Sequence, residues 1–172
     1  MTELRKLREK LCRELSQSEH SAIAQPRREA RRLGEVPPAR AILAIAKHAE
    51  EQRPRLYALV SGRRSGAVGI ELGRWIGELF SLLRHYLFDR LIDTERSYRG
   101  TLLGVSHGVD IVRLLSAVAT REGDERLLQF CEEWLGERQS LLALAQEELA
   151  WFAERPRLAV QSGLGRALAP MT

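Results

Sequence analysis

The chain has 172 residues, of which 44% are hydrophobic and 29% charged, and a net charge of +4; these values are typical of a globular protein rather than a disordered one. Aromatic residues make up only 6%, and Leu, Ala, Arg and Glu dominate, so the composition favours helices over sheets. The sequence has no run of about 18 uncharged apolar residues, so no membrane span is predicted. The charged first ten residues are not followed by an apolar segment of the kind that a secretory signal contains, and we therefore expect a cytoplasmic protein. We expect one helical domain over residues 1–155 and a partly disordered C-terminal tail over residues 156–172.

Two helices are predicted in the first third of the chain. The first begins near Thr2 and carries leucines three and four residues apart on one face, at Leu4, Leu7, Leu11 and Leu15. Pro26 is expected to kink this helix or to start a new one, and Gly34 to end it. The second helix runs from about residue 38 to 60, and Pro54 is expected to bend it.

The rest of the chain predicts two or three further helices. Residues 67–92 form a broad apolar helical pattern that continues without a proline towards Thr120. One straight helix over that length would reach about 80 Å, so we expect a break between residues 93 and 100. Asp124 is a good N-cap for a last helix to about Ala153. The sequence therefore predicts an up-and-down bundle of four to five helices.

Six glycines interrupt the predicted third and fourth helices at intervals of four residues. Each costs a helix about 1 kcal/mol relative to alanine, which calls for a reason such as close helix approach. Local softness of the helices is the alternative. The glycines are Gly69, Gly73, Gly77, Gly100, Gly104 and Gly108.

Charge is distributed unevenly along the chain. Residues 27–64 hold ten Lys or Arg against four Glu, whereas residues 122–154 hold nine acidic residues against two Arg. This asymmetry favours pairing between helices, or a basic surface for an anionic partner. The best candidates for a nucleic-acid surface are the arginines of one outer helix face: Arg27, Arg28, Arg31 and Arg32.

Two histidines stand three residues before an acid: His48 before Glu51, and His107 before Asp110. Residues three apart on a helix can bind one metal ion. A bundle with such ligands on paired helices resembles the ferritin-like superfamily, which implies a di-iron or manganese site. That family carries Glu-x-x-His, so the order here is reversed.

The resemblance would require further carboxylates from Glu14 or Glu19 on the first helix and Glu78 on the third. Helical geometry places Glu51 and Asp110 on polar outer faces and both histidines on the flanks. Ordinary surface histidines are therefore the alternative to a metal site.

Charged residues on inward helix faces are a second kind of candidate site. Arg53, Arg138 and Glu29 fall within the apolar stripes of their helices. A buried arginine must be paired, so we expect an internal Arg–Glu network or a small anion-binding cavity.

No enzyme motif accompanies these residues. A phosphate-binding loop, a dinucleotide fingerprint and a nucleophile elbow are all missing from the sequence. Cys12 and Cys131 have no nearby partner motif and are expected to be buried free thiols. The leading hypothesis is a bundle that acts through protein–protein contact or self-association; metal binding and anion or nucleic-acid binding are the alternatives.

Overall fold

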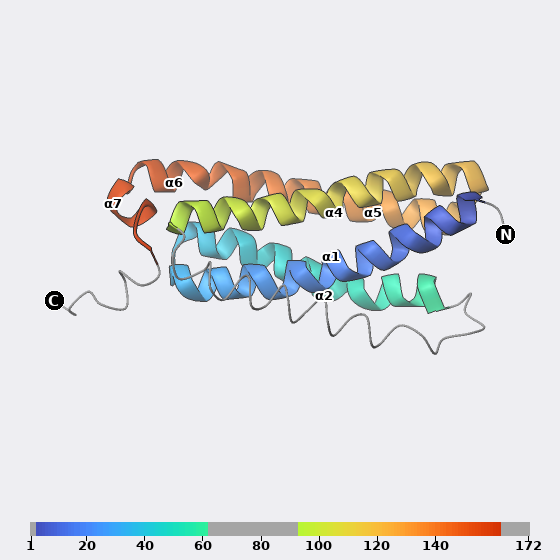
Figure 1. Ribbon diagram of the computed structural model, residues 1–172, viewed down its shortest axis with the longest axis horizontal. Coiled ribbons are helices and arrows are strands. Elements are labelled where there is room, and N and C mark those ends of the chain that lie inside the picture. The colour runs from blue at the N-terminus through green and yellow to red at the C-terminus, as the bar shows by residue number, and fades with distance from the viewer. Residues whose placement is uncertain (1–2, 62–92, 163–172) are drawn as a thin grey trace.

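The computed structural model describes residues 3–61 and 93–162, which form an elongated bundle of helices (Figure 1). Four long helices make up the bundle: α1 (Glu3–Leu33), α2 (Pro37–Ser61), α4 (Thr94–Glu122) and α5 (Glu125–Glu147). Two short helices follow, α6 (Leu149–Ala153) and α7 (Pro156–Ala159). The predicted all-α class is confirmed, and the described residues contain no strand beyond one isolated bridge.

Two tight turns join the long helices into antiparallel pairs. Gly34 ends α1 at a φ of 81°, and Gly123 ends α4 at a φ of 67°, a conformation that only glycine adopts readily. The Asp124 side chain then caps α5 by accepting a hydrogen bond from the Leu127 amide at 3.1 Å. The predicted stop at Gly34 and N-cap at Asp124 are thus confirmed.

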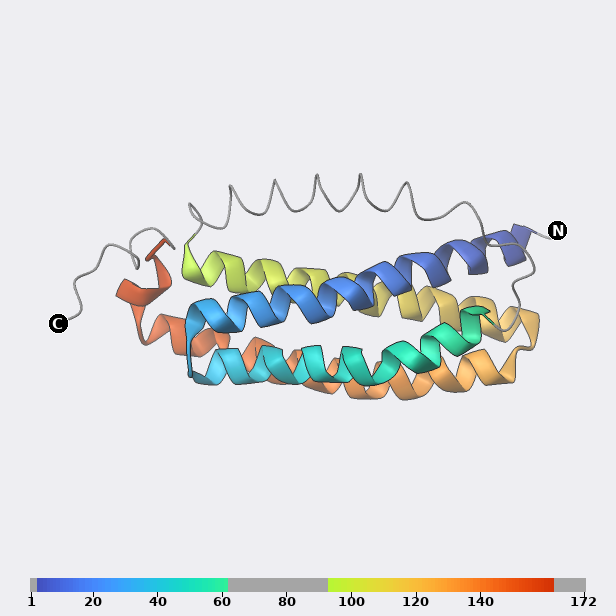
Figure 2. The ribbon, with the colours of Figure 1, turned by 90° about the horizontal axis from the view of Figure 1, so that it is seen from below.

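The four long helices lie side by side, as both views show (Figure 2). α1 packs beside α2 and α4, and α5 packs beside the same two helices, so α1 and α5 are diagonal across the bundle. α2 and α4 run in the same direction (Figure 1). The helix predicted over residues 67–92 lies outside the described residues.

Apolar side chains at helical spacing fill the centre of the bundle. Leu11 and Leu15 of α1, Ile42 and Ile45 of α2, and Leu115 of α4 are each at most 3% exposed. These positions repeat at three or four residues within each helix, so each helix turns one stripe inward. Burial of these stripes is the main force that holds the bundle together.

Both internal prolines lie within continuous helices. Pro26 is buried inside α1, so the expectation that a new helix starts there is wrong. Pro54 lies inside α2. α4 begins at Thr94, which confirms a helix boundary within the predicted interval.

The C-terminal segment is more ordered than its sequence predicts, at least as far as Ser162. The last long helix ends at Glu147 instead of continuing unbroken to Ala153. α7 follows, and the Thr94 hydroxyl donates a hydrogen bond to the Gln161 carbonyl at 2.7 Å. This contact ties the segment to the start of α4; residues 163–172 lie outside the described part of the chain.

The glycines of α4 differ in how closely α1 approaches them. A Cβ placed on Gly108 would lie 2.7 Å from Ser18 Oγ, and one on Gly104 would lie 3.3 Å from Gln25 Oε1. A Cβ on Gly100 would meet no atom of the described residues within 4 Å. Close helix approach therefore explains two of these three glycines but not Gly100. The predicted glycines 69, 73 and 77 fall outside the described residues.

α4 is the one helix among the described residues that is both long and apolar enough to be compared with a membrane span. By length and hydropathy it would suffice to cross a membrane, yet half of its most apolar window is buried inside the bundle. A core helix of a soluble protein meets the same test.

Substitution of Gly108 tests the close approach of α1 and α4. We expect Gly108→Leu to lower the free energy of unfolding by about 1–3 kcal/mol, because the new side chain must displace Ser18. Gly100→Ala is the control and should raise it by up to about 1 kcal/mol, since the position is open. Urea unfolding measures both, and an unchanged midpoint for Gly108→Leu would contradict the packing.

Candidate functional site

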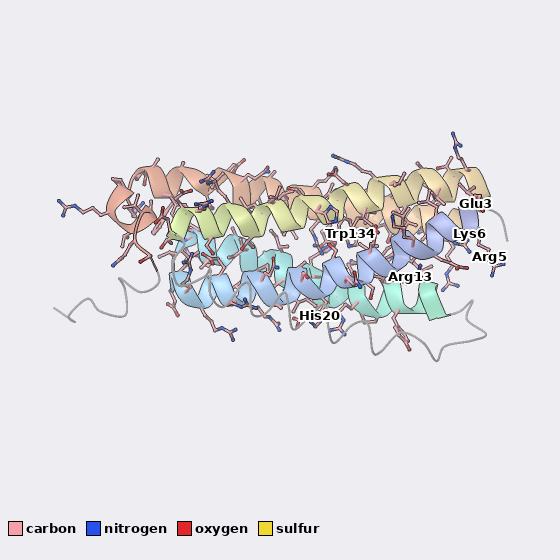
Figure 3. The ribbon with its side chains drawn as sticks, viewed as in Figure 1. Glu3, Arg5, Lys6, Arg13, His20 and Trp134 are labelled. Atoms are coloured by element: carbon pink, nitrogen blue, oxygen red, sulfur yellow. The ribbon has the colours of Figure 1, made fainter. Side chains whose placement is uncertain are left out.

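A cluster of four polar or aromatic side chains lies in the middle of the bundle. Glu19 comes from α1, His48 from α2, and Trp134 and Arg138 from α5. Each is at most 2% exposed. Figure 3 labels Trp134 near the midpoint of the long axis, among the helices, whereas His20 of α1 points outward. We call these four residues the core polar cluster.

Arg138 is the centre of the core polar cluster. Its Nη2 donates a hydrogen bond to Glu19 Oε2 at 2.9 Å, and its Nε donates one to His48 Nδ1, also at 2.9 Å. Its guanidinium lies over the Trp134 ring, 4.6 Å from the ring centre. One arginine therefore links α1, α2 and α5.

His48 is held neutral by these surroundings. Burial and the nearby positive charge of Arg138 lower the pKa of the imidazole to about 4. Because an arginine can only donate, His48 Nδ1 is the accepting nitrogen and the proton resides on Nε2. That Nε2 lies 3.4 Å from Glu137 Oε2 without forming a hydrogen bond.

Glu19 carries the compensating charge. Burial raises the pKa of its carboxyl group, while Arg138 and the Trp134 indole N–H, 3.4 Å from Oε2, lower it. Burial also lowers the pKa of Arg138, but an arginine starts so high that it stays charged. The described residues offer Glu19 Oε1 no hydrogen-bond donor. The pair is thus a buried ion pair with one unsatisfied acceptor.

The geometry makes the core polar cluster a connector rather than an open reaction site. All four side chains are enclosed by the helices. The two Arg138 nitrogens that donate hydrogen bonds, Nε and Nη2, both point at other side chains of the cluster. The inward position predicted for Arg138 is confirmed, and its carboxylate partner is Glu19.

Other predicted inward charges have different outcomes. Glu29 is 5% exposed, and its carboxylate accepts hydrogen bonds from Arg32 Nη2 and Ser97 Oγ, both at 2.7 Å. The inward position predicted for Glu29 is therefore confirmed. Arg53 is exposed on α2, so its predicted burial is wrong. Arg53 lies next to Pro54, at the outer edge of the apolar stripe.

The predicted metal ligands do not come together. His48 is buried, contrary to the expected flank position, whereas Glu51, His107 and Asp110 are exposed. Asp110 instead pairs with Arg113 of its own helix at 3.2 Å. Within residues 3–61 and 93–162, no group of three His, Cys, Asp or Glu side chains could hold one ion. The remaining predicted ligand, Glu78, lies outside the described residues.

The predicted basic surface is only partly exposed. Arg27 and Arg31 lie on the outside, and Arg27 pairs with Glu50 of α2 at 2.6 Å. Arg28 is half-buried, and Arg32 turns inward to Glu29 and the Thr94 carbonyl. The four side chains therefore do not form one solvent-facing stripe. Arg55 of α2 forms an ion pair with Glu133 of α5, which is one contact between the basic and the acidic segment of the chain.

Both cysteines are free, as predicted. Cys131 is fully buried, and burial raises the pKa of its thiol to about 12. Cys12 is half-buried and its pKa is also raised, mainly by burial. Neither environment favours the thiolate that thiol catalysis requires.

The sequence analysis did not include Trp134 in a site, and it named Glu19 only as a possible metal ligand and not as the partner of Arg138. Glu19 lies four residues after Leu15 and three before Ala22, which places it on the inward stripe of α1. This spacing was a sufficient signal for Glu19. Nothing in the spacing alone tells that Glu19 faces Arg138, because the pairing of distant helices depends on the fold.

An exposed apolar face on α4 is the second feature that calls for a function. Leu103 is 73% exposed and Leu114 is 47% exposed. They belong to a row of exposed residues that alternate by three and four positions, which we call the α4 outer stripe: Gly100, Leu103, His107, Asp110, Leu114 and Ala117. The described helices leave this stripe unburied.

Comparisons with known proteins add no relative: no family model, no curated protein and no solved structure matches the chain.

Removing one partner of the buried ion pair should be costly. We expect Arg138→Leu to lower the free energy of unfolding by about 3–5 kcal/mol, because Glu19 would be left buried without its counter-charge. The double variant Glu19→Leu, Arg138→Leu should recover most of the loss. Arg53→Leu is the control and should change stability by less than about 0.5 kcal/mol. Equal effects of Arg138→Leu and Arg53→Leu, measured in urea, would contradict the pairing.

Protonation of His48 should couple stability to pH. Its pKa is about 4 in the folded chain against an ordinary 6.5, so the unfolded chain binds the proton more readily. Stability should therefore fall as the pH decreases from 6.5 to 4, by up to about 1.4 kcal/mol per unit. In His48→Gln, which keeps an acceptor for Arg138, this part of the pH dependence should vanish. An NMR titration midpoint for His48 at 6.5 or above would refute the assignment.

Proposed function

We propose that this protein acts by binding protein through the α4 outer stripe. The observation that carries the proposal is the exposure of Leu103 and Leu114 on one helix face. The two leucines lie about three turns apart on this face with polar residues between them, and surfaces that combine exposed apolar side chains with polar neighbours are typical of interaction sites. The small residues Gly100 and Ala117 at its ends would let a partner helix approach closely.

The chemistry of the α4 outer stripe favours a protein over a lipid partner. Asp110 lies at its middle and is exposed, next to Arg113, and burying such a charge in a bilayer is expensive. A protein surface can offer hydrogen bonds to the carboxylate and to His107. A nucleic acid would require a row of available cations. The stripe contains none, and the two arginines beside it, Arg99 and Arg113, are paired with Glu95 and Asp110 of the same helix.

The core polar cluster supports this proposal by fixing the frame that carries the stripe. Arg138 can satisfy both Glu19 and His48 only in one register of α1, α2 and α5. α4 packs against α1 and α5, so its exposed face is presented in one orientation. A rigid, preformed surface loses less entropy when it binds.

Site-specific photo-crosslinking tests this function. With a photo-reactive phenylalanine at Leu103 in the full chain in cells, we expect a covalent adduct to a protein that mass spectrometry identifies. The same probe at Arg53, exposed on α2, is the matched control. Leu114→Glu should abolish the adduct, because it places a charge in the same row. No adduct at Leu103 beyond that at Arg53 would sink the proposal.

A further inference from the structure

We infer that the partner of the α4 outer stripe is a second copy of this chain, packed antiparallel through α4. This inference rests on the proposed function, because it uses the same surface. It starts from the spacing of the stripe: its members alternate by three and four residues, which is the seam of a two-helix coiled coil. All of them are exposed in the single chain, so the seam has no partner among the described helices.

The stripe is self-complementary about the point midway between residues 108 and 109. In an antiparallel pair around that point, Leu103 of one copy meets Leu114 of the second copy, and the same contact occurs twice. His107 likewise meets Asp110 of the second copy, so an imidazole N–H faces a carboxylate on both sides of the axis. Gly100 meets Ala117, the two smallest members of the stripe.

In the antiparallel arrangement, each residue of the α4 outer stripe meets a chemically suitable residue of the second copy. The apolar residues meet each other, and the hydrogen-bond donor meets the acceptor. A parallel pair would instead place His107 on His107 and Asp110 on Asp110, which brings two carboxylates together. The charges therefore specify the antiparallel direction.

Gly100 supplies an independent argument. It is exposed inside α4, and a Cβ there would meet no described atom within 4 Å, so packing among residues 3–61 and 93–162 gives no reason for a glycine. A glycine inside a helix lowers stability by about 1 kcal/mol relative to alanine. Opposite Ala117 of a second copy, the missing side chain lets the two helix backbones approach closely.

The next positions at the same spacing, Arg96 and Arg121, are both exposed and would oppose each other at the two ends of the seam, which weakens the pairing there. The arginines on the flanks nearer the centre have counter-ions on their own helix. Arg99 is held by Glu95 of its own helix at 2.6 Å, and Arg113 by Asp110 at 3.2 Å. Beside the seam, Arg113 of one copy faces Ser106 of the second copy. Ser106 is half-buried, small and polar, so it does not repel the arginine. The interface is confined to one helix per copy, so we expect a dimer of modest affinity.

Sedimentation equilibrium of the purified full chain, from about 10 μM to about 1 mM, tests the dimer because small interfaces dissociate in this range. We expect a dimer whose dissociation constant rises at least about tenfold in His107→Asp, since carboxylates then face one another. Adding Asp110→His to that variant should restore it. Leu103→Glu should dissociate the dimer, whereas Leu144→Glu, at a 55% exposed position on α5, should not. A wild-type chain that stays monomeric at about 1 mM would overturn the inference.

Disulfide trapping tests the direction. A mixture of Leu103→Cys and Leu114→Cys chains should form a cross-chain disulfide far faster than Leu103→Cys alone, and the unmodified chain controls for Cys12 and Cys131. Faster trapping of Leu103→Cys alone would show a parallel pair and overturn the inference. A monomeric chain whose Leu103 crosslinks to another protein would overturn the dimer but leave the proposed function standing. A crosslink from Leu103 to residues 67–92 of its own chain would overturn both.

Discussion

Arg138 joins three of the four long helices through hydrogen bonds to Glu19 and His48 and a contact with the Trp134 ring. Hydrophobic burial brings helices together but fixes their relative positions weakly, because leucines and isoleucines pack in many ways. A buried charge does not allow this freedom, since it must find its partner or remain unpaired in a medium that solvates it poorly. The arrangement of α1, α2 and α5 therefore depends on this one side chain.

The ion pair spans the diagonal of the bundle, because α1 and α5 are not direct neighbours. A pair across the diagonal restrains both helices at once against rotation and sliding, whereas a pair between neighbours restrains one interface. Ion pairs of the latter kind lie at the edges, as between Arg27 and Glu50, and exposed pairs of this type contribute little to stability. The bundle thus combines weak peripheral pairing with one strongly constrained central contact.

Local patterns predicted most of the fold. The stop at Gly34 and the cap at Asp124 follow from residue chemistry within a few positions, whereas the break before α4 was expected from the length of an unbroken helix. Burial of Arg138 and Glu29 followed from helical periodicity. Arg53 was misplaced because periodicity locates a face only to within about one flanking residue. The pairing of the buried charges could not be predicted from the sequence, since Glu19 and Arg138 meet only when the tertiary structure forms.

The diagonal pair also constrains the order of events during folding. Glu19 and Arg138 are separated by 119 positions, so no early local step can satisfy both charges. On a ribosome that adds about 5–20 residues per second, Glu19 waits roughly ten seconds for Arg138 to be made. During that interval the N-terminal helices hold a carboxylate on the face that will become the core. Closing the core around Glu19 before Arg138 is present would leave a buried charge unpaired, so complete closure of the bundle requires its last long helix.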